Sequence, residues 1–453
     1  MIGRFPGMLG CLATAMIVMA AETLAGEGYL RLEGHGGPVK GVAISPDGKY
    51  ALTASFDYSV GFWDLEDGRL LRWLEGHEAA ANDAIFVPGD RALSVGDDFD
   101  LILWDLKTGN ILRRMQGHKG KLLSVTLSPD GTLAATSGWD GRVGLWSFDS
   151  DDPPRWLDGH RANVNAAVFS TDGSKLYTAS YDGTIRRWDV ASLREEARLV
   201  NHGFGVNQLV LNEKDGWLAY GAVDGAVRAI SLATGDEIAD LTADRRPILA
   251  LDADRDKRFL AVGDGEGFIT IIDTSSWVIV RDFRAALSGP IWALAWEPDG
   301  GRLLTGGLSE DAVLWPIGGD AVLFTAARES FQKPPHEMSN GERQFVRKCS
   351  ICHSLSPDGG RKAGPSLWGV FGRRAGTLPG YHYSDALLSA DIVWSDATIA
   401  RLFDEGPERV TPGSKMPMQK INGAVDRDDL IAYLKENTGP ARARGNDSQG
   451  EQQ

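Results

Sequence analysis

Cysteine is scarce in this chain, with only three in 453 residues. So few cysteines exclude a fold held together by several disulfides, and they exclude a structural zinc site built from two cysteine pairs. Positive charge is also in deficit, because 47 lysines and arginines face 62 aspartates and glutamates, which gives a net charge of −15. A surface of that sign repels phosphate, so we expect no nucleic-acid partner.

Long hydrophobic runs are rare as well, and one follows Arg4 near the N-terminus, over residues 8–21. It is too short to span a bilayer comfortably, so no stable membrane span is expected. A basic residue, an apolar run and small residues behind it are typical of a secretory signal peptide, which we assign to residues 1–25. The alternative is an uncleaved anchor. Cleavage would leave Cys349 and Cys352 as the last two cysteines.

Residues 28–317 repeat a pattern about every forty residues. Gly-His pairs recur at steps of 41 or 42 residues, and each is followed by Trp-Asp or a remnant of it. The pairs end at His35, His77, His118 and His160, and a weaker Asn-His pair ends at His202. Short segments of alternating apolar and polar residues, separated by turns such as Ser-Pro-Asp-Gly, fill the repeats. This pattern predicts short antiparallel strands arranged as a β-propeller.

The repeats closely resemble the WD-repeat family, and we count seven of them. The resemblance implies a seven-bladed propeller of four-stranded blades, with a structural hydrogen-bond set in each well-preserved blade. In blade one the set would be His35, Ser55, Asp57 and Trp63. The turn position of Asp57 is filled in blades two to seven by Asp98, Asp140, Asp182, Asp224, Glu266 and Ser309. Because the repeat sends each histidine to a different blade, we expect structural histidines and no shared metal site.

The segments that border the repeats differ in character. Residues 29–34 match the strand that precedes each Gly-His pair, so we expect them to form the outer strand of blade seven and close the ring. Residues 321–326 are a rival for that place. Residues 318–338 are polar and contain proline, which is typical of a linker. Residues 439–453 are polar and poor in apolar side chains, which favours a disordered tail.

The last hundred residues carry a different motif. Ser339 followed by Glu342 is a capping box, which predicts a helix that delivers Cys-Ser-Ile-Cys-His, residues 349–353, at its C-terminal end. Two cysteines three apart with a histidine behind them form the attachment sequence of haem c. A zinc site would need four ligands, and a thioredoxin-like motif would need a βαβ setting. A simple disulfide would leave His353 unexplained.

Residues 339–438 closely resemble mitochondrial-type cytochrome c and its bacterial relatives, almost end to end. The resemblance rests on "GERQFVRKCSICHSL", "KAGPSLWGVFGRRAG", "LPGYHYSDAL", "IVWSD", "PGSKM" and "DRDDLIAYLKENT". It implies one covalent haem c per chain, bound through Cys349 and Cys352, with its iron ligated by His353 and Met416. It implies that Pro365 holds the imidazole through its carbonyl group. The side chains that would line the propionates are Arg373, Tyr381, Tyr383 and Trp394.

The resemblance also pairs the first helix with the last, through Phe345 packed on Leu430 and Tyr433. Other residues are alternatives to Met416 as the sixth iron ligand. His336 and His382 are the histidines outside the repeats and the motif, and Met418 lies just beyond Met416.

Two departures from the mitochondrial pattern concern the distal side of the haem. Leu387 stands where relatives carry asparagine, and Leu402 or Phe403 stands where they carry tyrosine. The loss of those polar groups removes hydrogen bonds near the methionine sulfur. The reduction potential and the strength of the iron–methionine bond are therefore left open.

We expect a multidomain chain: an all-β seven-bladed propeller followed by an all-α class I cytochrome c domain. The resemblance implies one-electron transfer to redox partner proteins, with Lys348, Lys415 and Arg373 steering an acidic partner. That partner is either another redox protein or the acidic propeller itself. Covalent haem c is attached outside the bacterial cytoplasm, which agrees with a periplasmic protein.

The propeller would be an interaction platform for a partner that the sequence does not specify. Its recognition face could include loop residues that could equally be plain turn residues: Phe99, Trp139, Tyr181 and Phe204. One alternative is an oxidoreductase with a second cofactor or substrate site in the propeller. Another is a haem-based redox or ligand sensor. We assign no catalytic residue, and an electron carrier fits better than an enzyme.

Overall fold

The computed structural model describes residues 29–242, 247–286, 289–317, 337–357, 361–414, 416, 419–421 and 423–439. The predicted signal peptide, the rival closing strand at 321–326, and the side chains of His336, Lys415 and Met418 lie outside the described residues. So do most of the predicted linker and all but the first residue of the predicted tail.

The described strands form seven antiparallel sheets of four, one for each blade of a propeller. Blade one contains β2 (Val39–Ile44), β3 (Tyr50–Ser55), β4 (Ser59–Asp64) and β5 (Leu70–Glu75). Blade two contains β6 (Ala81–Val87), β7 (Arg91–Gly96), β8 (Leu101–Asp105) and β9 (Ile111–Met115). Blade three contains β10 (Leu122–Leu127), β11 (Ala134–Gly138), β12 (Arg142–Trp146) and β13 (Arg155–Asp158). Blade four contains β14 (Val164–Phe169), β15 (Lys175–Ser180), β16 (Thr184–Asp189) and β17 (Arg194–Asn201).

The remaining blades follow the same order. Blade five contains β18 (Val206–Asn212), β19 (Trp217–Ala222), β20 (Val227–Ser231) and β21 (Glu237–Asp240). Blade six contains β22 (Ile248–Ala253), β23 (Phe259–Asp264), β24 (Phe268–Asp273) and β25 (Val278–Arg284). Blade seven contains β26 (Ile291–Trp296), β27 (Arg302–Gly307), β28 (Ala312–Pro316) and β1 (Leu30–Leu32). The seven-bladed prediction is confirmed.

Strand β1 closes the ring, as the sequence predicted. It pairs antiparallel with β28, and Leu30 stands opposite Leu314. Leu32 is fully buried in a cluster that joins blades seven and one, together with Val39 and Leu304. This pairing gives blade seven its fourth strand and covers the edge of β28.

The core of the propeller lies between neighbouring blades. The second strand of a blade is enclosed on both faces, and in β3 every residue after Tyr50 is buried. One cluster combines Leu93 and Val95 of blade two with Leu122 and Val125 of blade three. The alternating pattern of each repeat therefore supplies two apolar faces, each packed on the next blade.

The hydrogen-bond set of blade one corrects one prediction. His35 Nδ1 lies 2.9 Å from Asp57 Oδ2, as expected. Its Nε2 lies 2.6 Å from Thr53 Oγ1, and Trp63 Nε1 donates to the same hydroxyl across 2.7 Å. The predicted Ser55 does not bond His35 or Trp63. Its hydroxyl donates to the carbonyl oxygen of Gly37 and accepts from the backbone nitrogen of Asp57.

The reason for the correction is the cross-strand register. Thr53 stands opposite Gly61. Because Gly61 has no side chain, the indole of Trp63 lies over it, and a Cβ there would be 2.4 Å from Trp63 Nε1. The indole therefore reaches Thr53. The same position is held in blades two to four by Ser94, Thr136 and Thr178.

The histidines of blades two to five bind the turn aspartates, as the sequence predicted. The pairs are His77–Asp98, His118–Asp140, His160–Asp182 and His202–Asp224. Each histidine serves its own blade, and the described residues contain no group of three or more His, Cys, Asp or Glu side chains suited to a metal ion.

A small helical region follows the propeller. Its helices are α1 (Asn340–Lys348), α2 (Asp385–Leu388), α3 (Asp396–Glu405), α4 (Pro407–Val410) and α5 (Ala424–Asn437). Much of the rest is irregular chain, so the structure shows a small helical region, and the all-α class I fold stays a prediction. Within the described part of the chain, no helix has the length and apolar character needed to cross a membrane.

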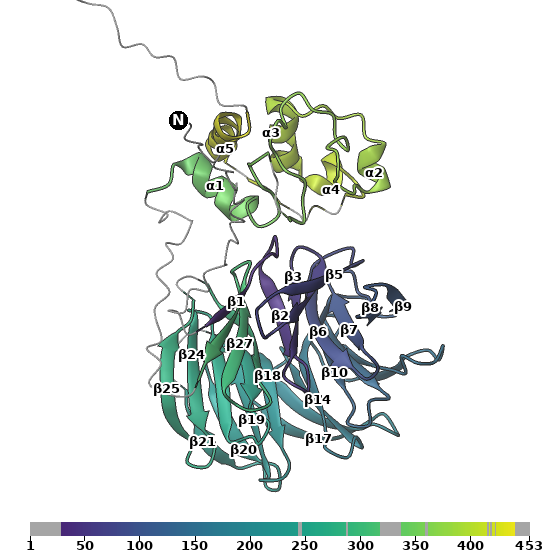
Figure 1. Cartoon of the computed structure of the whole chain (residues 1–453), viewed down its shortest axis with the longest axis vertical. Helices are drawn as coiled ribbons and strands as arrows, with labels where there is room; N and C mark the ends of the chain where they lie inside the picture. Colours follow the sequence, from purple (N-terminus) through teal and green to yellow (C-terminus); the bar gives the residue numbers. More distant parts are fainter. Residues whose placement is uncertain are drawn as a thin grey trace, which may run out of the picture.

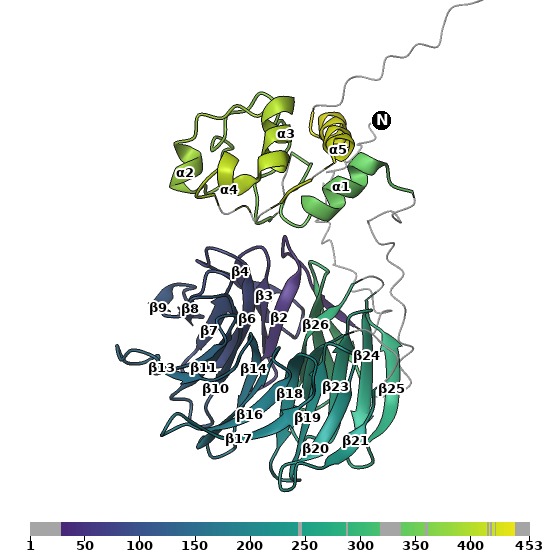
Figure 2. The same cartoon turned by 180° about the vertical axis from the view of Figure 1, so that it is seen from behind.

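Helices α1 and α5 pack against each other, as expected. The rings of Phe345 and Tyr433 lie 5.7 Å apart, and Leu430 is fully buried. The helices approach closely at Gly341, where a Cβ would lie 2.1 Å from the carbonyl oxygen of Asp429. Ser339 caps α1 by accepting a hydrogen bond from the backbone nitrogen of Glu342. Figures 1 and 2 show this region seated over one end of the propeller.

Candidate functional site

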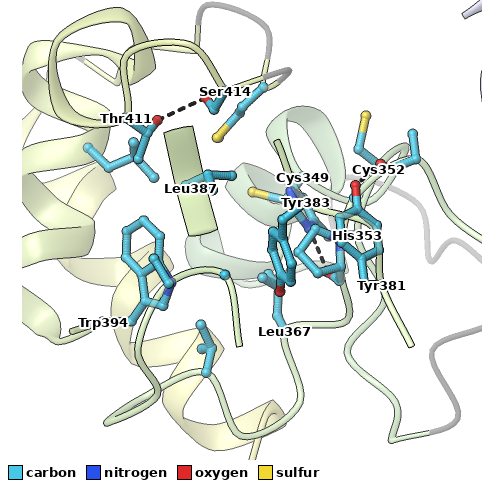
Figure 3. A pocket seen from close by; sticks show the side chains of 18 of the residues that line it. Cys349, Cys352, His353, Leu367, Tyr381, Tyr383, Leu387, Trp394, Thr411 and Ser414 are labelled. Atoms are coloured by element: carbon cyan, nitrogen blue, oxygen red, sulfur yellow. Dashed lines mark hydrogen bonds between the residues drawn. The ribbon is translucent and has the colours of Figure 1, made fainter. Parts of the chain in front are cut away.

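A large cavity opens inside the helical region. It holds about 1160 Å³ of empty space, part of it open to solvent. Its walls are mostly apolar, and Cys349, Cys352 and His353 all line it. Figure 3 shows these three side chains together on one side.

The turn after α1 brings the three motif residues together. The backbone nitrogens of Cys352 and His353 both donate to the carbonyl oxygen of Cys349, across 3.0 and 2.8 Å. The helix capped at Ser339 ends with Cys349 as its C-cap. Local sequence alone therefore positions both sulfurs and the imidazole at one wall.

The imidazole of His353 is held at its outer nitrogen. Nδ1 lies 2.8 Å from the carbonyl oxygen of Pro365. Nδ1 is therefore the protonated nitrogen, and Nε2 keeps its lone pair for a ligand in the cavity. Burial lowers the pKa of His353, and the bond to Pro365 opposes that shift only in part. A neutral imidazole is the form that binds a metal.

The two thiols are not bonded to each other in this structure. Burial raises the pKa of Cys349 to about 12, and it also raises the pKa of Cys352. Both groups are therefore protonated at neutral pH, unlike the thiolates of redox switches. This electrostatic setting disfavours a thiol redox switch.

The opposite wall contains a segment rich in small polar residues. Met416 lines the cavity and is partly buried. Thr411 and Ser414 line it too, and their hydroxyls lie 3.0 Å apart (Figure 3). We did not predict either hydroxyl, although both stand in the "TPGSKM" run that carries Met416.

The residues predicted to surround the propionates also line the cavity. Arg373 donates to the carbonyl oxygens of Trp368 and Ser366, each across 2.8 Å. Tyr381 donates to the carbonyl oxygen of Ala363, and its ring lies 4.7 Å from that of Tyr383. Burial raises the pKa of Tyr381 to about 12, so its hydroxyl stays a donor.

Trp394 lies on the far side of the cavity from these tyrosines in Figure 3. The structure therefore gathers every sequence-predicted site residue around one cavity. Pro365 is among them, and its carbonyl oxygen faces His353.

The departures from the mitochondrial pattern are part of the same wall. Leu387, Leu402 and Phe403 all line the cavity. Apolar side chains therefore occupy positions where the mitochondrial pattern has polar ones. His382 also contributes to the lining but is exposed.

Known proteins share this site in sequence. The family model described as "Cytochrome c" matches residues 338–438. Cytochrome c of Gibberella zeae is 41% identical over 102 residues, which cover 22% of this chain and 95% of that protein. The chain belongs to the cytochrome c family. Cytochrome c of Sesamum indicum is 41% identical over 109 residues, which cover 24% of this chain and 96% of that protein. Cytochrome c of Euglena viridis is 42% identical over 99 residues, which cover 22% of this chain and 95% of that protein.

A second family model describes the other part of this cytochrome c family member. The model described as "WD domain, G-beta repeat" matches residues 26–64, 109–147, 152–189 and 277–315. Together with the seven blades, these matches identify the N-terminal region as a WD-repeat propeller.

The cytochrome c family implies covalently bound haem with iron, and the residues of this cavity fit that group. Two sulfurs and one imidazole share a wall, a thioether side chain lines the same cavity, and the remaining walls are mostly apolar.

The propeller contributes to this cytochrome c site as well. Among the described residues that line the cavity, Tyr58 is the one from the propeller. It stands in the turn between β3 and β4. Nearby, Arg361 forms an ion pair with Glu75, and Lys362 forms one with Glu310. The sequence predicts the acidic propeller as one of two alternative partners of the cytochrome domain, but it does not indicate these residues.

Proposed function

We propose that this protein is an exported, periplasmic electron carrier with one class I haem c per chain and a propeller that recognises partner proteins. The cytochrome c domain implies haem-based electron transfer, and the WD-repeat propeller implies an interaction platform. The observation that carries the proposal is the shared wall of Cys349, Cys352 and His353, with the Pro365 carbonyl behind the imidazole.

Each residue has a distinct task in the proposal. Cys349 and Cys352 tether the vinyl edge of the porphyrin through thioethers. His353 binds iron through Nε2, and Pro365 fixes the ring orientation and raises the basicity of that nitrogen. Met416 supplies a thioether as the sixth ligand, which suits a high reduction potential. Bound haem supplies a one-electron iron couple.

Export and the single haem rest on sequence. The chain carries one Cys-x-x-Cys-His sequence, and residues 1–25 match a signal peptide. Covalent attachment of haem c outside the bacterial cytoplasm fits an exported chain. An acidic partner would meet the basic residues near the cavity, such as Lys348 and Arg373.

The test is production in a bacterial host that attaches haem c in the periplasm. We expect a mature mass that lacks the signal peptide and includes one haem, one iron per chain, and a pyridine haemochrome spectrum of two thioethers. Cys349→Ala and Cys352→Ala should each give a one-thioether spectrum or little holoprotein. Cys11→Ser is the control, since Cys11 lies in the signal peptide and should not affect the product. A cytoplasmic product without haem, or two irons per chain, would contradict the proposal.

A further inference from the structure

One turn position differs between two groups of propeller blades. It follows the turn aspartate and precedes the third strand. In blades three to six this position is glycine, with φ between 77° and 90°: Gly141, Gly183, Gly225 and Gly267. In blade one it is Tyr58 and in blade two Phe99, with φ of 73° and 70°. Bulky residues adopt this left-handed conformation at an energetic cost, so their presence calls for a compensating contact.

The three blades without this glycine are adjacent, and two of them, blades seven and one, contact the cytochrome domain. In blade seven the position is Glu310, which pairs with Lys362 of the cytochrome domain. Tyr58 enters the wall of the haem cavity. Cys352 and Tyr381 line the same cavity. Burial raises the pKa of Tyr58, so its phenol stays protonated. Phe99 does not line the cavity and is 40% exposed.

The position directly after the blade histidine also differs between blade one and blades two to four. Blades two to four carry long charged side chains there: Glu78, Lys119 and Arg161. Blade one carries Gly36, whose φ does not require glycine. A Cβ on Gly36 would lie 0.6 Å from the carbonyl oxygen of Arg361. The missing side chain therefore makes room for the cytochrome backbone.

Arg361 is held by blade one on three sides. Its guanidinium lies 4.3 Å from the ring centre of Trp73, and it forms an ion pair with Glu75. Its Nε lies 3.5 Å from Asp57 Oδ2, the carboxylate that also serves the hydrogen-bond set of the blade. These contacts combine a cation–π interaction with two charges of opposite sign.

We propose that blades seven and one form a built-in dock for the cytochrome domain, and that Tyr58 is a haem-site residue supplied by the propeller. The dock consists of Gly36, Asp57, Tyr58, Trp73, Glu75 and Glu310. Tyr58 covers the Cys352 side of the cavity and excludes water from it. A redox partner must then approach over another part of the haem edge or displace the propeller. This inference rests on the proposed haem binding.

The first test compares Tyr58→Gly with Phe99→Gly in the full-length holoprotein. Both variants install the residue that blades three to six use, so both relieve the same backbone strain and should keep the propeller folded. Tyr58→Gly should lower the haem midpoint potential, because water stabilises the more highly charged ferric form. It should also speed oxidation by ferricyanide several-fold. Phe99→Gly should change neither quantity. Equal results for the two variants would overturn the role of Tyr58.

The second test separates the cytochrome domain from the dock. Gly36→Lys copies the residue of blade three, and it should detach the cytochrome domain while leaving blade one intact. Small-angle scattering should show a larger radius of gyration, and ferricyanide should react faster, as in Tyr58→Gly. Lys362→Glu should act similarly, and adding Glu310→Lys should restore the compact form.

The outcomes separate the two proposals. Loss of the haem spectrum in the wild-type protein would refute haem binding. A normal spectrum with an unchanged radius of gyration in Gly36→Lys would refute the dock alone.

Discussion

The imidazole of His353 donates a hydrogen bond from Nδ1 to the backbone carbonyl oxygen of Pro365, 2.8 Å away. The residue before that proline, Gly364, packs against the same ring, and a Cβ there would lie 2.4 Å from His353 Cε1. The ring is therefore fixed both by a hydrogen bond and by close packing. Its orientation in the cavity depends on a residue that offers no side chain.

Gly364→Ala should disturb haem attachment and ligation. The added methyl group must displace the ring, and overpacking of this kind costs about 1–3 kcal/mol. We expect a lower ratio of haem absorbance to protein and an altered low-spin spectrum. Gly423→Ala is the matched control, because a Cβ there meets the side chain of Asp426 and no part of the cavity. Normal haem content and a normal spectrum in Gly364→Ala would show that the packing is not restrictive.

Thr53→Val should destabilise the propeller more than Ser55→Ala. The hydroxyl of Thr53 serves both His35 Nε2 and Trp63 Nε1, so its removal leaves two buried groups unpaired, at about 1–3 kcal/mol each. Ser55 donates to the carbonyl oxygen of Gly37 and accepts from the backbone nitrogen of Asp57. The Thr53 bonds should count for more, because they join the histidine and the tryptophan in one connected buried network. Urea unfolding followed by tryptophan fluorescence measures both variants. If Ser55→Ala cost as much as Thr53→Val, the corrected hydrogen-bond set would be wrong.

The propeller should lose stability in acid. Burial alone would raise the pKa of Asp140, but hydrogen bonds from His118 and from backbone nitrogens outweigh it and hold the pKa below 3.8. A carboxyl with a depressed folded-state pKa contributes stability above its unfolded pKa of about 3.9. That contribution disappears as the pH falls through the lower, folded-state value.

Asp140→Asn should test this contribution directly. It removes a charge-assisted hydrogen bond worth about 2 kcal/mol at pH 7, and it should matter much less at pH 3. Urea unfolding midpoints of the wild type and the variant at pH 7, 5 and 3 should therefore converge as the solution becomes acidic. A constant difference between the two unfolding midpoints at all three pH values would assign the stabilisation to packing.

Leu32→Ala should weaken ring closure. Leu32 is fully buried at the seam between blades seven and one, and such truncations cost about 2–5 kcal/mol. Leu30→Ala, in the same strand but only partly buried, should cost less. Thermal unfolding of both variants gives the comparison. Equal losses would mean that the strand contributes by backbone pairing and that Leu32 has no special packing role.

Sequence patterns predicted the features that repeat or that lie within a few residues. The 41- or 42-residue step located the blades, and the spacing of Cys349, Cys352 and His353 defined one wall of the cavity. Met416 and Pro365 were expected from resemblance over the whole region, and both contribute to the cavity lining. Thr411 and Ser414 were missed because no motif with a distinctive spacing marks these hydroxyl residues in the sequence.

Two other errors have different physical origins. Ser55 and Thr53 are two residues apart on one strand and share a face, so the motif alone did not decide which hydroxyl the histidine meets. The contact between Arg361 and Asp57 joins residues far apart in the chain, and no local pattern encodes it. Tyr58 did carry a signal, namely a large side chain where four other blades have glycine.

The pairing of Leu30 with Leu314 also sets an order of assembly. Blade seven cannot gain its fourth strand until the entire ring has been made and both of its ends meet, which is a contact of very high sequence separation. Glu310 belongs to that last blade, so the cytochrome domain rests partly on the seam that is completed last. A chain interrupted anywhere in the propeller therefore lacks a finished support for its haem-binding region, even though that region has its own separate core.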